Sequence, residues 1–176
     1  MRDGVTDLFG IEIPSTSPVF LIVVGAHVLI GLAAVVFGAI AIFSKKQLGR
    51  HPRFGICYYW AIIGTTVTAA LLTAVRFAEN VDVMTLGLLC LGAVWFGRTA
   101  LRRRWPHWAR LHLTGMGLSY ILLLTAFYVE NGADLPLWNR LPTIAYWLIP
   151  GAVGIPIIVF ALMFHPVARG LRQDGP

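Results

Sequence analysis

The sequence contains few charged residues. Asp, Glu, Lys and Arg together make up 12% of its 176 positions, whereas soluble domains carry about 25%. Hydrophobic residues fill 57% of the chain instead. This balance argues against an ordinary soluble domain and indicates an integral membrane protein.

Cysteine and catalytic motifs are also scarce. The two cysteines, Cys57 and Cys90, both lie in apolar runs, which argues against a disulfide framework. The sequence has no Gly-rich phosphate loop, Ser-His-Asp set, HExxH motif or CxxC motif. Hydrolase and nucleotide chemistry are therefore disfavoured. We assign no catalytic residue and favour a protein that is not an enzyme.

Long apolar runs are what the chain does contain. Five of them approach the roughly 20 residues that a helix needs to cross the hydrocarbon core. They cover residues 18–43, 54–75, 84–101, 111–129 and 144–164. The predicted fold is all-α: one domain, residues 1–176, forming an integral membrane bundle of five transmembrane helices.

The charged residues are segregated by sign along the chain. Eleven of the 14 Lys and Arg residues fall in 44–53, in 98–110 or at Arg169 and Arg172, and seven of the eight acids fall in the other connections. Lys and Arg in short loops stay on the cytoplasmic side. We therefore expect a multi-pass protein of the cell inner membrane, with its N-terminus outside and its C-terminus cytoplasmic. Anionic lipids, not nucleic acid, would balance its net charge of +6.

Histidine is the one residue type that suggests chemistry. His27 lies about nine residues into the first span, where an ionisable group is a functional candidate. The other four lie near the predicted cytoplasmic ends of the spans: His51, His107, His112 and His165. Histidines from separate helices are thus expected at one depth in the membrane.

Imidazole binds both metal ions and haem iron. A haem b could be held by His51 with His112 or by His112 with His165, and a non-haem metal ion by all three, since the spacing does not choose a metal. His27 would be a separate site or a hydrogen-bonded contact between helices. His107 is expected to take no part. The alternative interpretation is that these are ordinary interfacial histidines.

Small residues recur at three- and four-residue steps, which predicts close helix packing. One stripe runs through His27, Gly31, Ala34, Gly38 and Ala41, and another through His112, Gly115, Ser119 and Ala126. Such faces also suit an alternative function, a non-catalytic membrane scaffold or accessory subunit that binds partner helices. The last span contains Pro150 and Pro156, which predict a kink or local unwinding.

Four segments between residues 18 and 165 carry a resemblance to a known family. They read HVLIGLAAVVFGAIAIF, RHPRFGICYYW, RLHLTGMGLSYI and AFYVENGADLPLWNRLPTIAYWLIP. The chain resembles the uncharacterised bacterial membrane proteins called domain of unknown function 2306. This resemblance implies an inner-membrane helical bundle and no established reaction. More loosely, histidines on a small membrane bundle look like those of haem-handling and oxidase-assembly proteins. The leading hypothesis is a histidine-ligated haem or metal site used in electron transfer or respiratory-complex assembly.

Overall fold

The computed structural model describes residues 6–8, 11–13, 18–45 and 49–164. It contains five long helices: α1 (Pro18–Phe43), α2 (Arg50–Val75), α3 (Phe77–Arg102), α4 (Trp108–Asn131) and α5 (Thr143–Phe164). Each has 22 to 26 residues, or about 33 to 39 Å of length. All five are long and apolar enough to cross a membrane. The prediction of a multi-pass helical membrane protein is confirmed at this level.

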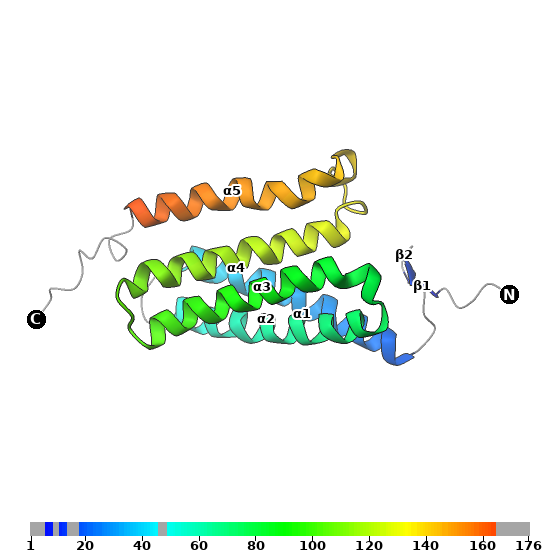
Figure 1. Cartoon of the computed structure of the whole chain (residues 1–176), viewed down its shortest axis with the longest axis horizontal. Helices are drawn as coiled ribbons and strands as arrows, with labels where there is room; N and C mark the ends of the chain where they lie inside the picture. Colours follow the sequence, from blue (N-terminus) through cyan, green and yellow to red (C-terminus); the bar gives the residue numbers. More distant parts are fainter. Residues whose placement is uncertain (1–5, 9–10, 14–17, 46–48, 165–176) are drawn as a thin grey trace, which may run out of the picture.

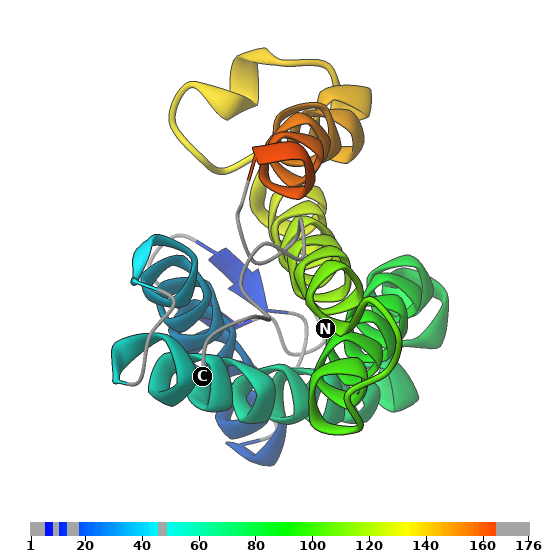
Figure 2. The same cartoon turned by 90° about the vertical axis from the view of Figure 1, so that its left-hand side faces the viewer.

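Neighbouring helices in the chain pack side by side and run in opposite directions (Figure 1). Helices α1 to α4 form the main bundle, in which α1 meets α2, α2 meets α3, and α3 meets α4. Helix α5 lies outside this group, and over the described residues it packs against α4 alone (Figure 2). The side chains of α5 that face away from α4 are exposed and apolar, as expected for a surface in contact with lipid.

This arrangement brings the basic segments together at one end of the bundle. The α1–α2 connection, the α3–α4 connection and the end of α5 all lie at that end, opposite the start of α1 (Figure 1). The predicted grouping therefore holds for the described basic residues of the α1–α2 and α3–α4 connections, and Arg169 and Arg172 lie outside the described residues. Which side of a membrane this end faces stays a prediction.

The helices are longer than the predicted spans at several ends. Helix α3 begins at Phe77, seven residues before the expected position 84, and only Arg76 separates it from α2. The predicted connection 76–82 is thus mostly helical. Hydropathy marks the part of a helix inside lipid, whereas a helix can continue into the interface with polar residues such as Asn80 and Asp82.

Two short strands precede the bundle, which is itself all-α as predicted. Strands β1 (Thr6–Leu8) and β2 (Ile11–Ile13) pair antiparallel, with Asp7 opposite Glu12. The hydropathy pattern that identified the helices gives no signal for a hairpin of this size, because three-residue strands are too short for period-two alternation to be recognised.

The small-residue stripes pack inside the bundle, as predicted. A Cβ added to Gly38 would meet the Tyr120 ring at 2.5 Å, and one added to Gly115 would lie 2.7 Å from the Cα of Gly97. The centre of the bundle contains the fully buried side chains of Tyr58 and Val94. These contacts follow the rule that small residues let helix backbones approach in lipid.

Helix α5 is continuous through both of its prolines. The local unwinding that Pro150 and Pro156 suggested is therefore absent from residues 143–164. Helix α4 is its packing partner, with Gly154 against the Ile121 side chain. Proline is tolerated in lipid when neighbouring groups and small backbone adjustments satisfy the freed carbonyls.

Candidate functional site

The fold brings His51 and His112 together. His51 is the second residue of α2, and His112 lies in the second turn of α4. Their ring centroids are 6.4 Å apart and the ring planes meet at 87°. Both side chains are half-buried. The sequence-based pairing of these two histidines at one level of the bundle is therefore present in the structure.

Each of the two rings is fixed by a backbone carbonyl on a neighbouring helix. His51 Nδ1 lies 2.8 Å from the carbonyl oxygen of Ala41, and His112 Nδ1 lies 3.0 Å from that of Gly97. A carbonyl oxygen only accepts, so Nδ1 carries the hydrogen and donates it in both rings. In the neutral imidazole the lone pair then belongs to Nε2.

The local sequence explains both carbonyl contacts. Ala41 lies in the last turn of α1, where carbonyls need partners from outside the helix. Neither Gly97 on α3 nor Gly115 on α4 has a side chain, so the backbones of the two helices approach closely at this point. The two glycines thus allow His112 to reach the α3 backbone.

The other histidines lie elsewhere or outside the described residues. His27 Nδ1 is 2.9 Å from Thr68 Oγ1, which joins α1 to α2. Thr68 follows His51 by 17 positions, which is about 25 Å along α2. His107 is exposed and precedes α4 with a left-handed backbone, φ 56°. His165, the predicted third ligand, lies outside the described residues, and its role stays a prediction.

The paired rings have a separation that suits one metal ion. If Nε2 of each ring pointed at one ion from opposite sides, metal–nitrogen distances of about 2.0–2.1 Å would place the ring centroids about 6 Å apart; the observed 6.4 Å, with the rings edge to face, is compatible with this. Metal-binding histidines commonly donate their second N–H to a backbone carbonyl, as both rings do here. Over the described ranges, no cluster of three or more His, Cys, Asp or Glu side chains is placed to hold a metal. Any ion here would take its remaining ligands from water or another donor.

The space around His51 and His112 suits a bare metal ion better than a haem. Two axial imidazoles are present, but a porphyrin also spreads sideways from its iron. Next to His112, the backbones of α3 and α4 touch at Gly97 and Gly115. A macrocycle on that side would require these helices to separate, whereas an ion between two nitrogens would not.

A second polar layer lies deeper in the bundle and was not predicted. Ser119 Oγ donates to the carbonyl of Met116 at 2.8 Å, and the Tyr58 hydroxyl lies 2.9 Å from Ser119 Oγ. The Cys90 thiol donates to the Ser119 carbonyl at 3.2 Å, and the Tyr120 hydroxyl donates to that of Val35 at 3.1 Å. Tyr58 follows His51 by seven residues on α2, and Ser119 follows His112 by seven residues on α4. This equal spacing is the feature of the sequence from which the second layer could have been predicted.

Comparisons with known proteins found no match among family models, curated proteins or solved structures. The resemblance to domain of unknown function 2306 therefore stays a prediction. The structure and its chemistry carry the functional argument.

Proposed function

We propose that this chain is a multi-pass membrane protein that holds a transition-metal cofactor between His51 and His112, for electron transfer or for assembly of a respiratory complex. The observation that carries the proposal is the shared arrangement of the two rings. Both donate Nδ1–H to a backbone carbonyl, and their centroids lie 6.4 Å apart. Contact between the α3 and α4 backbones favours a bare ion over haem b as the cofactor.

The proposal places the protein in the cell inner membrane with the histidine pair near the cytoplasmic face. The support is the collection of basic segments at the bundle end that carries His51 and His112. Lys and Arg in short loops determine orientation through their preference for the cytoplasmic side. The surrounding bilayer is the expected partner, with other membrane subunits as candidates.

A scaffold that binds partner helices through its small-residue faces is the alternative. The packing of those faces disfavours it. Gly38 is covered by Tyr120, Gly115 by Gly97, and Gly154 by Ile121, all within this chain. Gly38 and Gly115, which belong to the two predicted stripes, are therefore covered by the protein itself.

Metal retention by the purified protein tests the proposal. The protein in detergent would be incubated separately with Cu²⁺ and Zn²⁺, desalted, and assayed for metal and for a haem Soret band. We expect a stoichiometric amount of one ion in the wild type. His51→Gln and His112→Gln should each abolish retention, because a neutral amide is a poor ligand for these ions.

His107→Asn is the matched control, since His107 lies at the same bundle end and asparagine tolerates its left-handed backbone. This variant should retain metal as the wild type does. Equal loss in all three variants, or no stoichiometric metal and no Soret band in the wild type, would refute the proposed cofactor site.

A further inference from the structure

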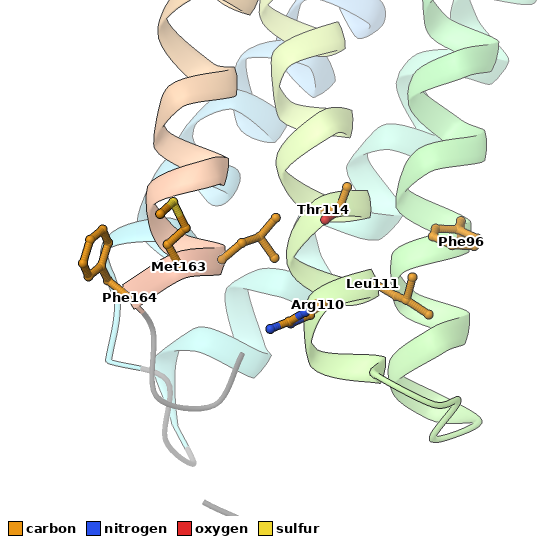
Figure 3. Close-up of a pocket in the computed structure, with 7 residues that line it drawn as sticks. Phe96, Arg110, Leu111, Thr114, Met163 and Phe164 are labelled. Atoms are coloured by element: carbon orange, nitrogen blue, oxygen red, sulfur yellow. The ribbon is translucent and has the colours of Figure 1, made fainter. Parts of the chain in front are cut away.

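A groove crosses the outer face of α4 at the bundle end that carries the basic segments. It has a volume of about 490 Å³, within the range of small-molecule sites. Figure 3 shows α4 between the other two helices, with Phe96 on α3 at one side and Met163 and Phe164 on α5 at the other. The groove exists because α3 and α5 both pack on α4 but, over the described residues, not on each other.

Among the described residues, the groove is lined by apolar side chains and one cation, Arg110. Its remaining lining residues are Arg110, Leu111 and Thr114 from α4 and Leu162 from α5. Arg110 is exposed and lies at the end of the groove nearest the α3–α4 connection, two residues after Trp108 begins α4 (Figure 3). Leu111 and Thr114 lie further along α4, toward the middle of the bundle.

The order of these groups along the membrane normal matches an amphiphile with a negative head. Arg110 is the third residue of the candidate membrane span α4, so its guanidinium would lie at the level of the lipid phosphates, and the apolar walls would extend into the hydrocarbon region. Exposed arginines of the α3–α4 connection, Arg103 and Arg104, lie at the same end and add positive potential. Basic pockets between transmembrane helices on the cytoplasmic side commonly bind anionic lipid headgroups.

We propose that this groove is a binding site for one anionic phospholipid, with its phosphate at Arg110 and an acyl chain between α3 and α5 against α4. The groove lies on the face of α4 that packs near α5, whereas His112 faces α3 and α2. The lipid site is therefore separate from the histidine pair and does not rest on the proposed cofactor.

Binding of phosphatidylglycerol and phosphatidylcholine to the full-length protein in detergent, measured by native mass spectrometry, tests this site. We expect phosphatidylglycerol to bind the wild type more tightly. Arg110→Gln should weaken phosphatidylglycerol binding about fivefold, which is the effect of one cation near a lipid surface, and weaken phosphatidylcholine binding less, because the choline cation offsets the charge of its phosphate. Arg103→Gln, which removes an equal charge outside the groove, should have a smaller effect.

The contact between the acyl chain and the groove is tested by a separate variant. Thr114→Trp fills the groove without changing charge, and we expect it to weaken binding of both lipids. Soluble glycerol 3-phosphate should fail to displace phosphatidylglycerol, because it has the phosphate but no chain. Equal losses in Arg110→Gln and Arg103→Gln, unchanged binding in Thr114→Trp, or displacement by glycerol phosphate would each overturn the site. Unfolding midpoints of the variants would verify that each remains folded.

Discussion

The hydroxyl of Tyr58 lies 2.9 Å from Oγ of Ser119 and joins α2 to α4 in the buried centre of the bundle. These residues follow His51 and His112 by seven positions on their respective helices, or about 10 Å. The same two helices are therefore connected twice, once at the histidine rings and once at this deeper hydrogen bond. The deeper bond fixes the register of the helices that present the histidines.

Tyr58→Phe and Ser119→Ala, which each remove the hydrogen bond between these residues, should lower the free energy of unfolding by different amounts. Tyr58→Phe leaves Ser119 Oγ bonded to the Met116 carbonyl, so we expect a loss of roughly 0.6 kcal/mol, the average for such bonds in membrane bundles. Ser119→Ala leaves a buried hydroxyl without the Ser119 oxygen and should cost about 1–3 kcal/mol. Unfolding in mixed micelles would measure both free energies. Equal, negligible losses would contradict the assigned bond.

The contact between Gly97 and Gly115 should tolerate no added methyl group. Gly115→Ala would place a Cβ 2.7 Å from the Gly97 Cα, so we expect destabilisation by about 1–3 kcal/mol. It should also weaken metal retention, since the Gly97 carbonyl that orients His112 would move. Gly92→Ala is the matched control on α3, because its Cβ meets nothing within 4 Å. A Gly115→Ala protein as stable as Gly92→Ala would disagree with this packing.

The His27–Thr68 contact should contribute to stability and not to the metal site. Thr68→Val removes the hydroxyl within hydrogen-bonding distance of His27 Nδ1, and we expect a loss of about 0.6 to 1.7 kcal/mol. Metal retention should be unchanged, because Thr68 lies 17 positions from His51, about 25 Å along α2. A variant that folds but no longer retains metal would place His27 in the cofactor site after all.

The orientation of the bundle can be tested by cysteine labelling in cells. Lys45, Arg103 and Asp134 are exposed residues in different connections, and each would be replaced by cysteine in a Cys57→Ser background. We expect an impermeant reagent added from outside to label Asp134→Cys alone. Labelling of Lys45→Cys and Arg103→Cys on opposite faces would conflict with the fold, and labelling of both from outside would invert the proposed orientation.

The five helices were predictable because hydropathy reports the composition of long segments directly. The start of α3 was not predictable from hydropathy. The helix begins at Phe77, directly after Arg76, and its first turns contain polar residues that lower the local hydropathy. The proximity of His51 and His112 was one of the pairings that depth and topology allowed. Their tautomers, in contrast, depend on the carbonyls of Ala41 and Gly97, which are separated from them by 10 and 15 positions. Hydropathy and residue spacing give no information on such inter-helix contacts.

X-ray absorption spectroscopy of the metal-loaded, purified protein tests the central claim most directly. The proposed site predicts imidazole scattering from two histidines at metal–nitrogen distances of about 2.0–2.1 Å, with the signal lost in a His51→Gln, His112→Gln double variant and kept in His107→Asn. Bound metal without imidazole scattering, or with the same spectrum in the double variant, would contradict a cofactor held between these two rings.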